Sequence, residues 1–256
     1  FVSHAATRTG ATIVLLDFIN WFNVHTEYII KIILLNGGEL LNKFTRVTNT
    51  LILNGALDIE KINDFIPHGS LIMLNTVASF KIVDSLYKNK GYKIISYIHE
   101  LERNLNMFPE ELNILVKNSE VILGASRAVT NNLLENHSIN PRIIEPINAF
   151  IKPLGITKTE QEKATFKKEN NIPLNSTVIV ACGTAFFIKN PKGFINVAEE
   201  VIGKGINAYF IWIGDGEERV QCLELVNNKK LSDRINFIGA IDNTREYFSY
   251  CDMFLL

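Results

Sequence analysis

Apolar, strand-like runs alternate with amphipathic segments along most of the chain, and this alternation limits the fold more than any other feature. The runs predicted to be strands are Phe1–Ser3, Ile29–Leu35, Leu51–Leu53, Leu71–Leu74, Ile94–Ile98, Val121–Leu123, Ile143–Ile144, Thr177–Cys182, Tyr209–Ile213, Ile235–Ile238 and Met253–Leu256. The segments with helical periodicity are Ala11–Phe22, Lys81–Tyr87, Ala128–Glu135, Pro191–Ile202, Glu217–Asn227 and Arg245–Tyr250. Such alternation favours parallel sheets with helices on both faces.

A polar stretch without strand-like runs, 158–176, separates two series of strands. We therefore predict two α/β domains, 1–155 and 156–256, with the boundary near residue 155. The helical segment "TEQEKATFKKENNIP" is expected to open the second domain. A chain of 256 residues is long enough for two such domains.

Composition excludes several classes of protein. A hydrophobic content of 47% supports a real core, and a net charge of −1 argues against nucleic acid as a partner. The three cysteines, Cys182, Cys222 and Cys251, have no paired spacing, which favours a reducing compartment over disulfides or a metal site. The longest apolar stretches are far shorter than the roughly 20 residues of a membrane span, and no signal peptide is recognised.

Both ends of the sequence lead us to expect a fragment. The chain opens on Phe1-Val2-Ser3-His4, without a methionine, and closes on the apolar run Met253–Leu256. A buried parallel strand with nothing after it leaves a sheet unfinished. We expect the second domain to be truncated and this 256-residue piece alone to be catalytically inactive.

The segment "ACGTAFFIKNPKGFINVAEEV", residues 181–201, combines a strand end, a glycine, a lysine and a helix start. Asn190 suits a helix N-cap and Pro191 the first helical position. The free N–H groups and the dipole of a helix N-terminus favour an anion, and Lys189 adds a full charge. The pattern is neither a Walker A loop nor a GxGxxG turn. By itself, Lys189 is compatible with an ordinary solvated loop residue as well as with a diphosphate ligand.

Polar residues and glycines recur where the predicted strands end. They are His4, Asn75-Thr76, His99-Glu100, Gly124-Ala125-Ser126, Gly183-Thr184, Gly214-Asp215-Gly216 and Gly239. Ligands of open parallel sheets bind outside the carboxyl ends of the strands. Two such domains facing each other would line a cleft with these positions.

A set of motifs in a fixed order resembles one enzyme family. The motifs are "SHAATRTGA" (3–11), "LNTVAS" (74–79), "YIHELE" (97–102), "ASRAVTNNL" (125–133), "GTAFFIKN" (183–190), "IGDGEE" (213–218) and "INFIGAIDNTREYFSYCDMFLL" (235–256). Together they are similar to the retaining glycosyltransferases of family 4. The resemblance implies the GT-B fold, in which two Rossmann-like domains face each other across a cleft. Residues 1–155 would be the acceptor-side domain and residues 156–256 the nucleotide-sugar-binding domain.

The resemblance also implies roles for individual residues. His99 would be the cleft histidine near the transferring sugar, and it is the catalytic candidate. The donor-binding candidates are Thr9, Gly10, Ala11, Gly183, Thr184, Lys189, Gly214, Gly216, Gly239 and Ile241. Thr9, Gly10 and Ala11 would approach the diphosphate and the sugar, Gly183 and Lys189 would bind the phosphates, and the loops at Gly214–Gly216 and Gly239–Ile241 would border the nucleotide.

Two departures from the family pattern stand out. The family places an arginine in the phosphate loop, where this chain has Thr184 or Ile188, and Lys192 is a possible replacement. The family's acidic motif, two glutamates eight positions apart, would follow the strand that Met253 begins, beyond the last residue.

Several side chains have simpler readings. His4 is equally compatible with a structural and a functional role, and Glu100 and Glu102 are expected to orient a loop or face solvent. His25, His68 and His137 are expected at the surface. Asn75-Thr76 is compatible with a helix cap. Phe186-Phe187 is compatible with the core or with the floor of the donor site, and the core is favoured.

The function favoured by these features is transfer of a sugar, of hexosyltransferase type, from a nucleotide-diphosphate sugar to a glycan or lipid-linked acceptor. Retention of configuration and a place in cell-surface polysaccharide assembly follow from the resemblance alone. We expect no cofactor and no metal, a cytoplasmic location, and leave peripheral association with the inner face of the membrane open. The alternatives are a sugar-nucleotide epimerase on the same fold and a two-lobed, non-catalytic small-molecule receptor. The sequence leaves the donor base, the sugar, the acceptor and the oligomeric state open.

Overall fold

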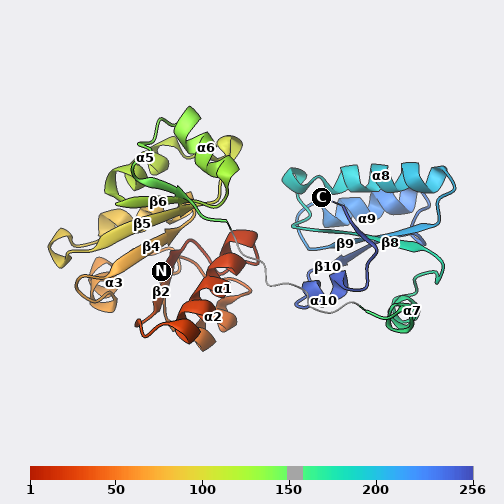
Figure 1. The fold of residues 1–256 in the computed structure, drawn as a ribbon, viewed down its shortest axis with the longest axis horizontal. Coiled ribbons are helices and arrows are strands. Elements are labelled where there is room, and N and C mark those ends of the chain that lie inside the picture. Colours follow the sequence, from red (N-terminus) through yellow and green to blue (C-terminus); the bar gives the residue numbers. More distant parts are fainter. Residues whose placement is uncertain (149–157, 256) are drawn as a thin grey trace. The chain divides into compact units, whose positions relative to one another are not determined.

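The computed structural model describes residues 1–148 and 158–255, which divide into two compact units, Phe1–Ile151 and Lys152–Leu256. Figure 1 shows the elements of each unit. The predicted domain boundary near residue 155 lies outside the described residues. Each unit is a parallel sheet with helices on both faces, and each is considered by itself.

The first unit follows the predicted alternation of strands and helices. Its elements are β1 (Val2–Ser3), α1 (Gly10–His25), β2 (Lys31–Leu34), α2 (Leu41–Val47), β3 (Asn49–Ile52), α3 (Ile59–Phe65), β4 (Leu71–Asn75), η1 (Val77–Ser85), η2 (Lys88–Lys90), β5 (Lys93–Ile98), α4 (Glu102–Leu105), α5 (Pro109–Asn118), β6 (Val121–Gly124), α6 (Arg127–Asn136) and β7 (Ile144–Pro146). Within residues 1–148, seven strands form one parallel sheet in the order β3-β2-β1-β4-β5-β6-β7. The strand order reverses between β1 and β4, which is where open α/β sheets bind ligands.

Alternation of side chains along the strands separates the core of this unit into two layers. On β2, Ile33 packs into the cluster that includes η1, α5 and α6, whereas Ile32 and Leu34 pack with α1 and α2 on the other face. Successive side chains of a strand point to opposite faces, so an unbroken apolar run requires cover on both. Within the predicted strand Ile29–Leu35, the uninterrupted apolar stretch Ile32–Leu35 therefore marks a buried parallel strand.

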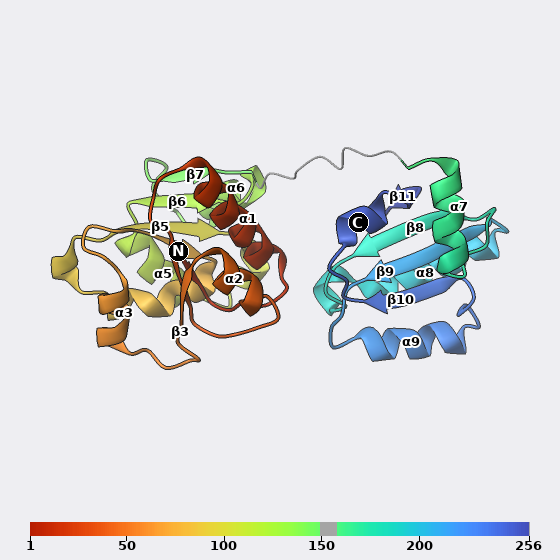
Figure 2. The same ribbon diagram turned by 90° about the horizontal axis from the view of Figure 1, so that it is seen from below.

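The second unit repeats this architecture on a smaller scale. Its elements are α7 (Glu160–Glu169), β8 (Thr177–Cys182), η3 (Phe187–Lys189), α8 (Pro191–Gly203), β9 (Ala208–Ile213), α9 (Arg219–Asn228), β10 (Ile235–Gly239), α10 (Thr244–Phe248) and β11 (Met253–Phe254). Within residues 158–255, four strands pair in parallel in the order β10-β9-β8-β11. Helices α8 and α9 cover one face of this sheet, and α7 and α10 the other (Figures 1 and 2).

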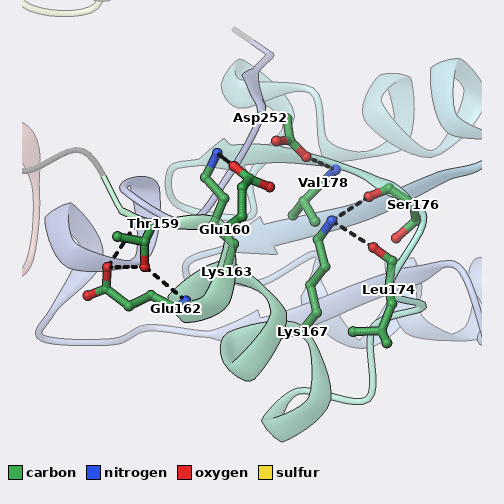
Figure 3. Close-up of polar contacts among 9 residues, drawn as sticks. All are labelled: Thr159, Glu160, Glu162, Lys163, Lys167, Leu174, Ser176, Val178 and Asp252. Carbon is green, nitrogen blue, oxygen red and sulfur yellow. Dashed lines mark hydrogen bonds and ion pairs between the residues drawn. The ribbon is translucent and has the colours of Figure 1, made fainter.

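Helix α7 is capped at its start, and near its end a lysine binds the loop that leads into β8 (Figure 3). Thr159 and Glu162 form a capping box, in which each side chain binds the backbone N–H of the other residue. Near the end of the helix, the Lys167 ammonium donates to the carbonyl oxygens of Leu174 (3.1 Å) and Ser176 (2.8 Å). The helix is the first element of the described part of the second unit.

The predicted strands correspond to the observed ones, but the helices are only partly predicted. Helices α2, α3, α4 and α5 were not among the predicted segments. The segment predicted as a helix over Lys81–Tyr87 lies mostly in the 3₁₀ run η1, which ends at Ser85. The short α2 and α3, with seven residues each, bury only one or two side chains each, so their apolar periodicity is weak. Within the described parts of the chain, no helix is long and apolar enough to cross a membrane.

Candidate functional site

Polar side chains of the first unit meet at the carboxyl ends of β1, β4 and β5. The Asn75 side chain lies 3.0 Å from His99 Nε2 through its oxygen and donates to the Ala11 carbonyl (3.3 Å) through its nitrogen. Beside this pair, Thr76 Oγ1 lies 3.3 Å from His4 Nδ1. Thr76 adopts a left-handed φ of 73° and makes no side-chain cap bond, so the expectation that Asn75-Thr76 caps the next helix is wrong. These two side chains bind the two histidines instead.

Glu100 joins two of these strand ends. Its carboxylate accepts hydrogen bonds from the backbone N–H of Val77 (3.3 Å), after β4, and of His99 (3.0 Å), after β5. Burial raises the pKa of this carboxyl, while the backbone hydrogen bonds oppose the shift. The contacts are those of a residue that orients a loop, as the sequence analysis expected for Glu100.

Both histidines of this edge are held neutral by their surroundings. Burial lowers the pKa of His99 to about 4 and also lowers the pKa of His4. The His99 ring packs against the Tyr97 ring with centroids 4.1 Å apart. A neutral imidazole has one donor and one acceptor nitrogen, so His99 offers directional hydrogen bonding rather than charge at neutral pH.

The start of α1 borders the same edge. Thr9 is the N-cap residue but makes no side-chain cap bond; its hydroxyl lies 3.0 Å from that of Thr12. A Cβ added at Gly10 would meet no atom within 4 Å. Thr9, Gly10 and Ala11, the predicted donor-binding residues of this unit, therefore lie together with His99 at the reversal point of the sheet, with open space over Gly10.

Three glycine-containing loops of the second unit interlock at the carboxyl ends of β8, β9 and β10. Gly183 N donates to Ile213 O (2.9 Å), and Gly214 N donates to Gly239 O (2.8 Å). The Trp212 indole N–H donates to Gly183 O (3.1 Å). Gly214 has a φ of +135°, and a Cβ there would lie 2.0 Å from Gly183 O, so only glycine fits.

A second close contact lies further along the same loops. Ala185 N donates to Asp215 O (2.9 Å), and a Cβ on Gly216 would lie 2.6 Å from Ala185 O. Asp215 accepts a hydrogen bond from its neighbour Gly216 N (2.9 Å), as a turn residue does. The loops after β8 and β9 are therefore one packed structure.

Lys189 lies across the glycine that ends β8. A Cβ on Gly183 would lie 3.2 Å from Lys189 Cγ and 3.3 Å from Cδ, so the absence of a side chain at Gly183 makes room for the lysine stem. Lys189 is exposed and has no carboxylate partner within the described residues. The next residue, Asn190, caps α8 as predicted, because its side chain accepts from Gly193 N (3.0 Å). The ammonium is thus carried by the residue that precedes the cap of a 13-residue helix.

The neighbours of Lys189 differ from two expectations. Lys192, considered as a replacement for the family's arginine, pairs with Glu218 (3.0 Å) and donates to Gln221 (3.2 Å) of the α9 region. Phe187 is 47% exposed, so the expectation that it lies in the core is wrong. Thr184 is exposed beside Gly183.

Arg219, which sequence reasoning missed, supports the loop after β10. Its guanidinium Nη2 donates to Phe237 O (2.9 Å), and its atoms lie about 3.6 Å from the position of a Cβ on Gly239. Gly239 has a left-handed φ of +80°. A signal was present in the sequence, because an arginine in the first turn of a helix opposes the helix dipole. Ile241, a donor-binding candidate of this loop, packs partly buried against the α7–α10 face.

One of the remaining histidines departs from its predicted position. His25 and His68 are exposed as expected, but the His137 side chain is only 15% exposed and its Nε2 lies 2.9 Å from Glu102 Oε2. The expectation of a surface His137 is wrong because Glu102, 35 positions away in sequence, covers it. No group of three or more His, Cys, Asp or Glu side chains in the described ranges is placed to hold a metal ion.

The sequence of the second unit matches a known protein family. Residues 162–256 match the family Glycosyl transferases group 1. The match covers nearly all of the second unit, including Gly183, Lys189 and the interlocked loops. The match spans 95 residues, from 162 to 256.

Two curated relatives are similar over part of their length. The O-antigen biosynthesis glycosyltransferase WclY of Escherichia coli is 30% identical over 97 residues, 38% of this chain and 26% of the relative. The N-acetyl-alpha-D-glucosaminyl L-malate synthase of Bacillus anthracis is 24% identical over 168 residues, 64% of this chain and 43% of the relative. The chain therefore aligns with less than half of each of these relatives.

Solved structures share the fold. The Anabaena Alr3699/HepE structure in complex with UDP and glucose superposes with a TM-score of 0.79 over 99% of this chain and 73% of that chain, at 12% identity. WaaG, a glycosyltransferase involved in lipopolysaccharide biosynthesis, has a TM-score of 0.68 over 99% of this chain and 74% of that chain, at 7% identity. The predicted fold class, α/β with two Rossmann-like parallel sheets of the GT-B type, is confirmed.

Proposed function

We propose that the chain belongs to a glycosyltransferase that moves a sugar from a nucleotide-diphosphate sugar to a glycan or lipid-linked acceptor, with retention of configuration, in the assembly of a cell-surface polysaccharide. The observation that carries the proposal is the packing of the Lys189 stem across Gly183, beside the start of α8. It is supported by the group 1 domain match and by the O-antigen glycosyltransferase among the relatives.

The donor diphosphate is proposed to bind at the carboxyl edge of the second sheet. Lys189 supplies a full positive charge, and the first turn of α8 supplies backbone N–H groups and the positive end of a helix dipole. Thr184 is exposed beside Gly183 and offers a hydroxyl to the same anion. The similar HepE structures hold UDP and UDP-glucose, which supports a nucleotide-sugar ligand for this fold.

The nucleotide is proposed to lie along the row of glycines that ends β8, β9 and β10. Gly214 and Gly239 are joined by a backbone hydrogen bond and carry no side chain, so a flat ring can approach the backbone closely. Gly216 and Ile241 are also proposed to border the nucleotide. The Arg219 guanidinium stabilises β10 and the loop after it by donating a hydrogen bond to Phe237 O.

The chemistry requires stabilisation of the negative charge that develops on the departing nucleotide diphosphate. Preorganised cations and N–H groups provide this, and they are the largest contribution in many enzymes. Lys189 and the start of α8 are the groups proposed for it. In the first unit, His99 is the residue proposed to contact the transferring sugar, and Thr9, Gly10 and Ala11 are proposed to approach the donor from the open start of α1.

We further propose peripheral contact with the inner face of a membrane, where a lipid-linked acceptor would reside. Four large side chains near the end of α1 are exposed: Trp21, Val24, Tyr28 and Ile29. Tryptophan and tyrosine suit the interface between lipid and water. Cosedimentation of the protein with anionic vesicles tests this, and a Trp21→Ser, Ile29→Ser variant is expected to bind fewer vesicles. Equal binding by both would contradict the proposal.

The donor site is tested by Lys189→Ala. We expect the variant to bind UDP with an affinity lower by about 1.5–3 kcal/mol, the contribution of a charge-assisted hydrogen bond, or roughly 10- to 150-fold. Isothermal titration calorimetry measures this. Lys204→Ala is the matched control, because Lys204 follows the same helix and its ammonium pairs with Glu200 at the surface (3.6 Å). An unchanged affinity in Lys189→Ala would assign this lysine to the solvated loop.

A further inference from the structure

Asn75 is a fully buried polar residue held between two different elements. Its side chain is 0% exposed at the end of β4. One end of the amide faces the Ala11 carbonyl in the first turn of α1 (3.3 Å), and the other faces His99 Nε2 after β5 (3.0 Å). A buried amide is costly unless both ends are hydrogen-bonded, so this geometry determines how the group must be oriented.

The Ala11 carbonyl settles the orientation of the amide. A carbonyl oxygen only accepts, so the nitrogen of Asn75 must face Ala11 and its oxygen must face His99. The reverse orientation would place the two oxygen atoms against each other. Because Asn75 Oδ1 also only accepts, His99 Nε2 must carry a proton and donate it.

The other nitrogen of His99 is then an acceptor. Burial lowers the pKa of His99 to about 4, so the ring holds a single proton at neutral pH. With that proton on Nε2, Nδ1 has a free lone pair. Nδ1 has no hydrogen-bond partner among the described residues, and the Tyr97 ring and the Glu100 carboxylate, which binds the His99 backbone, restrict how the residue can turn.

We propose that Asn75 is the positioning residue that fixes the proton of His99 on Nε2, so that Nδ1 is presented as a hydrogen-bond acceptor. An acceptor of this kind recognises a hydroxyl group and cannot donate to a phosphate oxygen. That the hydroxyl belongs to a sugar rests on the proposed function, because a sugar substrate offers hydroxyl donors to Nδ1. Through Ala11, the same amide couples the orientation of His99 to the start of α1.

Nitrogen-15 NMR of the histidine rings tests the proton position without reference to activity. The His99 signal is assigned by its loss in His99→Gln. In the wild-type protein near pH 7, we expect Nε2 to carry the proton and Nδ1 to carry none. In Asn75→Ala, we expect a mixture in which a part of the molecules carry the proton on Nδ1. Thr76→Val, which removes the neighbouring contact to His4 Nδ1, is the control and should leave the His99 tautomer unchanged.

A second variant keeps the acceptor and changes the charge. In Asn75→Asp, a carboxylate still accepts from Nε2, so the Nε2–H tautomer should persist, and the His99 pKa should rise because the anion favours the imidazolium. The acidic limb of the pH–rate profile should then move from near pH 4 toward neutrality. For sugar transfer, kcat/KM of Asn75→Ala should fall about tenfold, mainly through kcat.

A wild-type protein with the His99 proton on Nδ1 would overturn the proposal, and so would an unchanged tautomer in Asn75→Ala. If the tautomers are as expected but the wild-type enzyme transfers no sugar from any nucleotide sugar, the positioning role stands and the proposed function fails. The two failures are therefore distinguishable.

Discussion

The close approach of Gly214 to the Gly183 carbonyl makes Gly214→Ala the most informative substitution in the second unit. The methyl group would lie 2.0 Å from Gly183 O and 2.8 Å from Gly183 C, and both are backbone atoms. Neither can move without disturbing the hydrogen bond from Gly183 N to Ile213 O or that from Gly214 N to Gly239 O. The substitution therefore acts on all three loops of the proposed donor site.

The size of the effect follows from two costs. An alanine at a φ of +135° costs about 1–3 kcal/mol in backbone strain, and forcing a methyl group into a packed contact costs a further ~1–3 kcal/mol. We expect the free energy of unfolding of the second unit to fall by about 3 kcal/mol. The matched control is Gly203→Ala at the end of α8, where a Cβ meets nothing within 4 Å and the change should be within about 0.5 kcal/mol or slightly stabilising.

Trp212 reports the perturbation directly. Its indole N–H donates to Gly183 O, the atom that the new methyl group would strike, and its side chain is buried. The sequence has two tryptophans, so a Trp21→Phe background leaves Trp212 as the single emitter. Denaturant titration followed by its fluorescence measures the stability of this unit alone. A Gly214→Ala protein with the midpoint of the control and unchanged Trp212 emission would refute the packing described for these loops.

Further predictions concern the rest of the chain. Thr159→Ala removes the capping box of α7 and should lower the free energy of unfolding of the second unit by about 1 kcal/mol, measured by urea titration. Thr165 is exposed on the same helix, so Thr165→Ala should have little effect. Equal effects of the two substitutions would contradict the role of the cap. Burial lowers the pKa of His99 to about 4, so as the pH falls this histidine is protonated in the unfolded chain before it is protonated in the folded protein. The contribution of neutral His99 to stability should therefore be full above about pH 6.5 and decrease as the pH drops toward 4. His99→Gln should make this decline shallower in thermal denaturation monitored from pH 7 to pH 4, and a decline of the same slope would contradict the account.

The strands were predictable from the sequence because parallel strands buried on both faces leave continuous apolar runs. Ile32–Leu35, within the predicted strand Ile29–Leu35, is such a run and overlaps β2, and Val178–Ala181 forms most of β8. The carboxyl ends of β8 and β5 gave the candidate residues Gly183 and His99. Turn chemistry also worked locally, since Asn190 caps α8 as its position before Pro191 predicted.

Contacts between residues distant in sequence could not be predicted. The covering of His137 by Glu102 and the bond from Asn75 to His99 depend on how separate elements pack. Asn75 was interpreted as compatible with a helix cap, because a polar residue after a strand can cap the helix that follows. Only the arrangement of β1, β4 and β5 places it between Ala11 and His99. The role of Arg219 beneath Gly239 was hidden for the same reason.

The central claim is that a nucleotide diphosphate binds at the carboxyl edge of the second sheet. Titration of the nitrogen-15-labelled protein with UDP, followed by amide chemical shifts, tests it most directly. We expect saturable shifts at the amides of Gly183, Lys189, Gly214 and Gly239. In Lys189→Ala, the shifts at the three glycines should require a higher UDP concentration. Shifts confined to other parts of the chain, such as the cavity lined by Phe166 and Tyr250 between α7 and α10, or no shifts at millimolar UDP, would contradict the claim.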